Sequence, residues 1–210
     1  MGHRGHSARN ARPYGPDPFG RDAQNRTRIA QTAARLIVEH GIADWSLAKR
    51  KAARQLMLSE REALPADSEI ETALAEHHAL YGGSLHDETL HGQRTEALVW
   101  MEKLSAFQPV LIGGVAAGWA TAHSDIRLEL CADDAKAVEL ALINIGVSYR
   151  VPPARSRDAH SELHIETPRG GIRLIVMNDA GRRQRPRRDA QGNDEVRLSI
   201  SALSALLAQK

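Results

Sequence analysis

The sequence predicts an α+β fold, in which a helical N-terminal region precedes a small mixed β-sheet with flanking helices. Apolar residues recur at helical spacing over residues 25–105. Over 106–210, short apolar runs and a strict alternation of apolar and charged residues indicate strands. Residues 1–24 are rich in Gly, Pro, Arg and His, and we expect them to form a disordered basic tail.

Composition limits the class of protein. The chain has 28 Lys and Arg against 26 Asp and Glu, so its formal net charge is only +2, and binding of nucleic acid would need a local basic patch. The single cysteine, Cys131, excludes an internal disulfide and a cysteine-rich zinc site. No apolar run approaches the roughly 20 residues of a membrane span, and the N-terminus lacks the apolar core of a secretory signal. We therefore expect a cytoplasmic protein that does not bind membranes.

Four helices are predicted in the helical region. The first begins at Asn25 and ends at Gly41, because glycine readily adopts the left-handed conformation that closes many helices. A second helix with a basic face starts near Trp45. The third begins near Asp67 and ends at two glycines, and the fourth covers residues 87–105.

The C-terminal half contains the predicted strands, which cover residues 109–112, 124–130, 147–151, 162–167 and 172–178. The second of these alternates strictly, which places Arg127 and Glu129 on one face and Leu128 in the core. Asp133 and Asp134 cap a helix that precedes the third strand, and a closing helix covers residues 196–207.

The link between the first two strands carries the chemistry. Gly113 and Gly114 follow the first strand, and Ser124 and Asp125 open the second. Paired glycines allow the backbone to approach a phosphate closely. Carboxylates at positions i and i+2 of a strand share a face and can hold Mg²⁺. Here position i+2 is Arg127, whose guanidinium cannot ligate a metal.

The segment from Leu111 to Leu130 resembles the signature of the DNA polymerase β-type nucleotidyltransferase superfamily. From about residue 26 to its end, the chain is similar to small bacterial proteins of the nucleotidyltransferase-like family. This resemblance implies a minimal nucleotidyltransferase-type sheet in the domain at 106–210. The family motif more usually reads Ser-Asp-Ile-Asp, so the chain departs from it at Arg127.

The resemblance also implies roles for individual residues. Gly113, Gly114 and Ser124 would bind the phosphates of a nucleotide, and Asp125 would be a catalytic ligand to Mg²⁺. A third carboxylate on a neighbouring strand usually completes such a site, and Glu166 is our candidate for it.

The expected function is binding of a nucleoside triphosphate or a nucleic-acid phosphate, with Arg127 contacting the phosphate. Mg²⁺-dependent transfer of a nucleotidyl group is disfavoured, because Arg127 brings a positive charge to the place of the second carboxylate. The alternative from a different class is a non-catalytic interaction or regulatory scaffold.

A helix-turn-helix DNA-binding regulator is a less favoured alternative. The first two helices resemble the opening of a tetracycline-repressor-type domain, and the second carries Lys49, Arg50, Lys51 and Arg54. The third helix is acidic, which is the wrong charge for a recognition helix, and it carries Asp67, Glu69, Glu71 and Glu76. Sequence-specific DNA binding is therefore not expected.

Two further clusters have structural explanations. The run from Arg182 to Arg188 can steer a phosphate, but a solvated basic loop is the favoured interpretation. Four histidines lie close together in sequence without the spacing of a common metal site: His77, His78, His86 and His91. We expect these to be surface or core residues.

Overall fold

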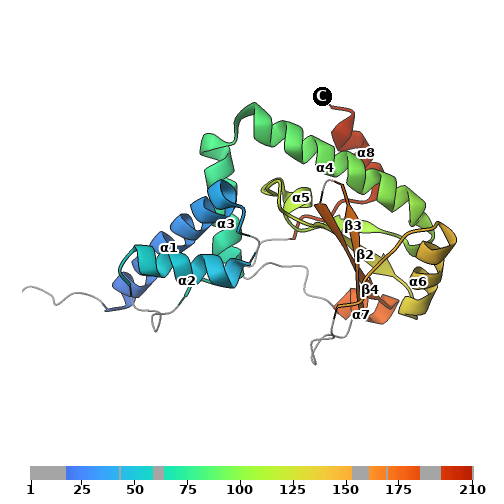
Figure 1. Cartoon of the computed structure of the whole chain (residues 1–210), viewed down its shortest axis with the longest axis horizontal. Coiled ribbons are helices and arrows are strands. Elements are labelled where there is room, and N and C mark those ends of the chain that lie inside the picture. The colour runs from blue at the N-terminus through green and yellow to red at the C-terminus, as the bar shows by residue number, and fades with distance from the viewer. Residues whose placement is uncertain are drawn as a thin grey trace, which may run out of the picture.

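The computed structural model describes residues 18–42, 44–58, 64–152, 161–168, 170–184 and 195–209. Within these ranges the chain forms eight α-helices and one four-stranded mixed sheet, which confirms the α+β class. Helices α1 to α3 form a group beside the sheet, and α4 runs from that group across the sheet (Figure 1). No described helix has the length and apolar character needed to cross a membrane.

The helical group consists of α1 (Pro18–His40), α2 (Trp45–Gln55) and α3 (Asp67–Tyr81). Small side chains at the contacts let these helices pack closely around a core that includes Ile29, Ala33, Ala48, Ala52, Ile70 and Leu74. Helix α1 begins at Pro18, seven residues before its predicted start at Asn25. The disordered tail was therefore predicted to extend too far, to residue 24. Residues 1–17 of that tail lie outside the described residues.

The sheet has the order β1-β2-β4-β3. Its strands are β1 (Val110–Ile112), β2 (Ile126–Cys131), β3 (Ser161–Thr167) and β4 (Gly170–Met177). Strands β2 and β4 are parallel, whereas β1 with β2 and β3 with β4 are antiparallel. The strand predicted at 147–151 is wrong, since only one bridge forms there, between Arg150 and His164. Pro152 follows directly and has no N–H to extend the pairing.

Helices cover one face of the sheet. These are α4 (Gly83–Lys103), α5 (Gly114–Ala117), α6 (Ala135–Asn144) and α8 (Ile200–Leu207). Although α4 was predicted as part of the helical region, its Trp100 and Met101 belong to the core of the sheet. Helix α8 starts later than predicted because Leu198 bridges Leu111 in extended conformation. Helix α7 (Asp179–Gln184) and a 3-10 turn (Ser105–Phe107) were not predicted.

The opposite face of the sheet carries the charged side chains of β2, Arg127 and Glu129. On β2, Ile126 and Leu128 are buried in the helix-covered core, which confirms the predicted alternation. Arg127 and Glu129 therefore project from the other face. Since β2 and β4 are parallel, their first residues lie together at one end of the sheet. That end faces the helical group and holds the candidate site.

Candidate functional site

Two arginines flank Asp125. The parallel register of β2 and β4 sets Arg173 directly beside Arg127. The Nη2 atom of Arg173 donates to Oδ2 of Asp125 at 2.9 Å, and the two side chains are 35% and 40% exposed. The carboxylate predicted to hold a metal is therefore neutralised by a guanidinium, and a second guanidinium lies on the neighbouring strand.

Gly171, the second residue of β4, makes room for Asp125. A Cβ atom added at Gly171 would overlap Oδ1 of Asp125, so only glycine allows the carboxylate to lie against the β4 backbone. Sequence reasoning missed both Gly171 and Arg173. Arg173 stands between Ile172 and Leu174, which is a signal for its face that the sequence analysis did not use. Its contact with Asp125, however, depends on the order of the strands.

The two glycines of the motif are explained by local geometry. Gly113 has φ of 71° and ψ of −156°, a backbone region that is almost exclusive to glycine. A Cβ atom at Gly114 would lie 2.7 Å from the indole ring of Trp119, so the ring closely covers this buried glycine. The sequence predicted that a phosphate would lie close to the backbone of these glycines. At Gly114 it is the ring of Trp119 that lies close to the backbone. Gly113 lies instead against the side chain of Arg127.

Ser124 organises the turn that leads into Asp125. Its Oγ accepts a hydrogen bond from the N–H of Thr121 at 2.9 Å. Gln93 on α4 donates through Nε2 to the carbonyl oxygens of Thr121 and Ser124, at 2.9 and 3.3 Å. Ser124 thus has a structural role, and it also lines the cleft described below.

Glu166 lies on the edge strand β3, and β4 separates it from β2. It forms an ion pair with Arg150, and both side chains are more than 70% exposed. Glu166 and Asp125 line one hollow of about 470 Å³, together with Arg150, His164 and Arg173. The structure therefore brings the two predicted carboxylates to a common hollow but sets Arg173, not Glu166, in contact with Asp125.

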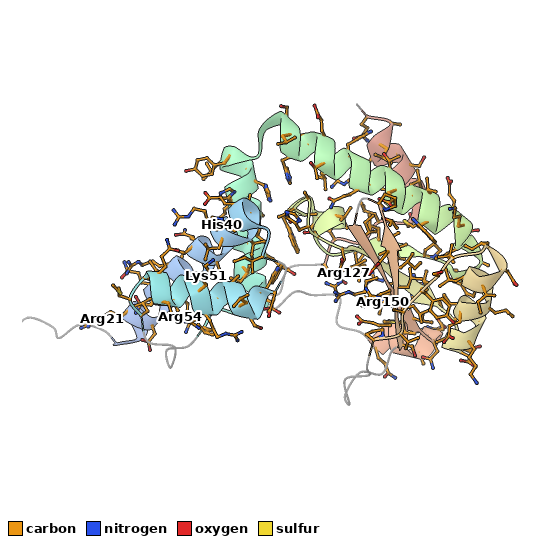
Figure 2. All side chains as sticks on the ribbon, in the orientation of Figure 1. Arg21, His40, Lys51, Arg54, Arg127 and Arg150 are labelled. Atoms are coloured by element: carbon orange, nitrogen blue, oxygen red, sulfur yellow. The ribbon has the colours of Figure 1, made fainter. Side chains whose placement is uncertain are left out.

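A cleft of about 610 Å³ separates the sheet from the helical group. The sheet side contributes Gly114, Ser124, Asp125, Arg127 and Arg173. The helical group contributes Asp44, Trp45, Ser46, Asp67 and Glu71. Figure 2 shows Arg127 at the end of the sheet that faces this group. The candidate site is thus the arginine-lined wall of the cleft.

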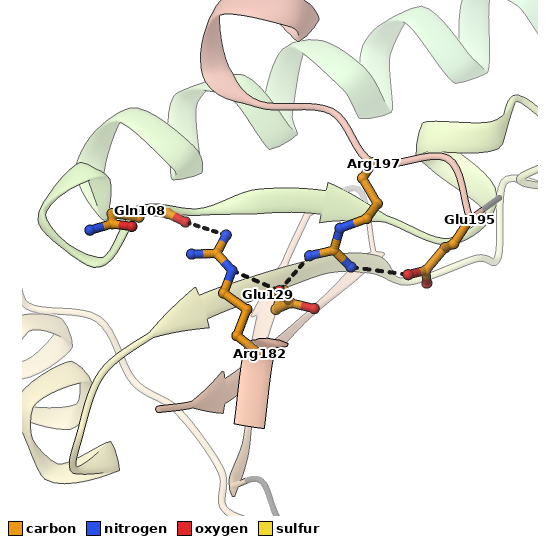
Figure 3. A network of polar contacts seen from close by, with 5 residues as sticks. All are labelled: Gln108, Glu129, Arg182, Glu195 and Arg197. Atoms are coloured by element: carbon orange, nitrogen blue, oxygen red, sulfur yellow. Dashed lines mark hydrogen bonds and ion pairs between the residues drawn. The ribbon is translucent and has the colours of Figure 1, made fainter. Parts of the chain in front are cut away.

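Glu129, the third charged residue of the segment that begins at Asp125, is fully buried, and Figure 3 shows its polar contacts. It accepts hydrogen bonds from Arg182 on α7, at 3.0 Å, and from Arg197 in the segment before α8. Burial lowers the pKa of Arg197, but the hydrogen bonds and the charges of Glu129 and Glu195 together outweigh it and raise the pKa. Arg182 also donates to the carbonyl of Gln108. The first arginine of the basic run is therefore structural rather than solvated, and Arg185 to Arg188 lie outside the described residues.

A pair of histidines, His78 on α3 and His86 on α4, connects the helical group to the turn between α5 and β2. The rings of His78 and His86 stack with centroids 3.8 Å apart, and His86 Nε2 lies 3.1 Å from the carbonyl oxygen of Gly118. Burial, together with the charges of His86 and His77, lowers the pKa of His78 to about 4, against a hydrogen bond with the backbone of Trp119. The His78 ring therefore favours its neutral form.

This pKa predicts the pH dependence of stability. Because folding lowers the pKa of His78 from 6.5 to about 4, stability should be lost as the pH falls through that window. The expected loss is on the order of 1 kcal/mol, since His78 is partly solvated. Urea unfolding at about pH 7 and about pH 5 measures it. His78→Gln should reduce the difference, and an unchanged difference would contradict this assignment.

The basic helix α2 does not present all its cations to solvent. Lys49 is buried, and its Nζ lies 2.6 Å from Oδ1 of Asp67 on α3. Lys51 and Arg54 are exposed (Figure 2). One of the four cations considered for contact with DNA therefore holds α2 to α3.

Comparisons of the chain with protein-family models, with curated proteins and with solved structures find no match. Among the described residues, no three His, Cys, Asp or Glu side chains are grouped as a metal site would require. The function must therefore be inferred from the chemistry of the cleft.

Proposed function

We propose that this chain is a nucleotidyltransferase-like protein that binds the phosphate of a nucleotide through Arg127 and Arg173, without a metal and without nucleotidyl transfer. The observation that carries the proposal is the pairing of Arg173 with Asp125 beside Arg127. The order of strand, Gly-Gly turn and Ser-Asp strand supports the family assignment.

The charges at the site favour an anion over Mg²⁺. The sheet wall of the cleft carries two guanidiniums and one carboxylate, and guanidinium groups bind phosphate oxygens in bidentate fashion. Mg²⁺ instead requires oxygen ligands, and Asp125 is occupied by Arg173 while Glu166 is paired with Arg150. The residues present do not fit a two-metal site.

A second observation supports a bound anion. The Nε atom of Arg173 is buried and has no hydrogen-bond partner within the part of the chain that the structure describes. Buried donors in proteins are nearly always satisfied by protein, water or ligand. A phosphate oxygen in the cleft is a suitable acceptor.

Arg173→Gln tests this proposal. Titration calorimetry with ATP and with inorganic tripolyphosphate, both in EDTA, should show affinities about tenfold or more below those of the wild type, because a charge-assisted hydrogen bond is lost. Arg35→Gln is the matched control, since Arg35 lies on α1 away from the cleft and pairs with Glu39. Unchanged affinity in Arg173→Gln would contradict the proposal. No binding of ATP, CTP, GTP or UTP by the wild type would favour the scaffold alternative.

A further inference from the structure

The cleft between the sheet and the helical group has walls of opposite charge. The sheet wall carries Arg127 and Arg173, and the helical wall carries Asp44, Asp67 and Glu71. We infer that the helical group supplies a nucleoside-binding subsite, so that the ligand is a nucleoside phosphate and not a free phosphate or polyphosphate. This inference rests on the proposed function, because it takes the phosphate to lie at the arginines.

Two tryptophans lie at the junction of the walls. Trp45 on α2 and Trp119 before β2 both line the cleft, and their rings lie 5.6 Å apart at an angle of 53°. Each ring is only half-buried, so apolar surface remains open to the cleft. Stacking of a base on an aromatic side chain contributes about 1–3 kcal/mol.

Both rings are held in place before any ligand binds. Trp119 packs on Gly114, where a Cβ atom would lie 2.7 Å from the ring. Trp45 is the first residue of α2, and Asp44 caps that helix by accepting from the N–H groups of Ser46 and Leu47 at 2.8 and 3.2 Å. A pre-organised aromatic surface loses little entropy on binding.

The acidic wall orients the ligand. Carboxylates repel phosphate but accept hydrogen bonds from ribose hydroxyls and from base amino groups. Glu71 on α3 is only partly exposed and lies on this wall with Asp67, which also pairs with Lys49. A nucleotide satisfies both walls when its phosphates face Arg127 and its nucleoside faces α3. The cavity of about 610 Å³ lies within the usual range for small-molecule sites.

The test compares ATP with inorganic tripolyphosphate in EDTA, since these ligands share a phosphate chain and differ in the nucleoside. We expect the wild type to bind ATP about tenfold or more tightly than tripolyphosphate, from the stacking contribution. Trp45→Ala should lower the ATP affinity severalfold, toward that of tripolyphosphate, and leave the affinity for tripolyphosphate unchanged. Trp45→Phe should retain most of the preference, and Trp100→Phe, in the core of the sheet, should retain all of it.

A second variant keeps the inference testable if Trp45→Ala fails to fold, as judged by circular dichroism. Glu71→Gln should weaken the binding of ATP but not the binding of tripolyphosphate. Glu76→Gln, on the same helix but outside the cleft, should leave both affinities unchanged. Equal affinity of the wild type for ATP and tripolyphosphate would overturn the nucleoside subsite and leave the proposed function intact. Failure of the wild type to bind either ligand would overturn both.

Discussion

Replacing Glu129 with Ala is expected to lower the free energy of unfolding by about 3–5 kcal/mol, because removal of one partner leaves uncompensated buried charge. Glu129 has no exposed surface, and it accepts from both Arg182 and Arg197. Without the carboxylate, two guanidiniums that are only 18% and 20% exposed would face each other. Urea denaturation followed by circular dichroism measures the change.

Glu166→Ala is the matched control for this prediction. Glu166 also pairs with an arginine, Arg150, but both partners are more than 70% exposed. Exposed pairs contribute at most about 1 kcal/mol. Equal losses of stability in Glu129→Ala and Glu166→Ala would show that the buried network does not hold α7 and the segment before α8 to the sheet.

The second large effect concerns metal dependence. Arg127→Asp alone should weaken phosphate binding about tenfold or more, since it removes a cation and adds an anion. It should not make binding depend on Mg²⁺, because Arg173 still neutralises Asp125. The double variant Arg127→Asp with Arg173→Asp should make phosphate binding depend on Mg²⁺, since three carboxylates would then share one end of β2 and β4.

Calorimetric titration of ATP into both variants, with Mg²⁺ and with EDTA, distinguishes these outcomes. Arg35→Asp in the same background controls for the change in net charge. Mg²⁺-dependent binding by the Arg127→Asp variant alone would show that the Asp125–Arg173 pair does not oppose the metal. The role assigned to Arg173 would then be wrong.

Local sequence signals predicted the elements that carry the site. The alternation along β2 placed Arg127 and Glu129 on one face, since the side-chain period of a strand is two. The helix after β2 was predicted from a cap at Asp133 and Asp134, and of these two Asp134 accepts a hydrogen bond from the N–H of Lys136. Both signals depend only on neighbouring residues.

Contacts between distant residues could not be predicted in the same way. Arg173 lies 48 residues from Asp125 and meets it because β4, and not β3, pairs with β2. Glu129 was placed on the open face correctly, but its burial depends on Arg182 and Arg197, which come from later segments. Likewise, Trp119 covers Gly114 through a turn whose path the sequence does not reveal. The candidate site therefore emerged only when the order of the strands was known.

Titration of wild-type protein with ATP, in Mg²⁺ and again in EDTA, tests the central claim most directly. The pair of Arg173 with Asp125, beside Arg127, predicts that ATP binds in EDTA at least as tightly as in Mg²⁺, and that no pyrophosphate is released. Binding that requires Mg²⁺, with pyrophosphate release that Asp125→Ala abolishes, would contradict the claim. The chain would then be a working nucleotidyltransferase that draws its remaining metal ligands from elsewhere.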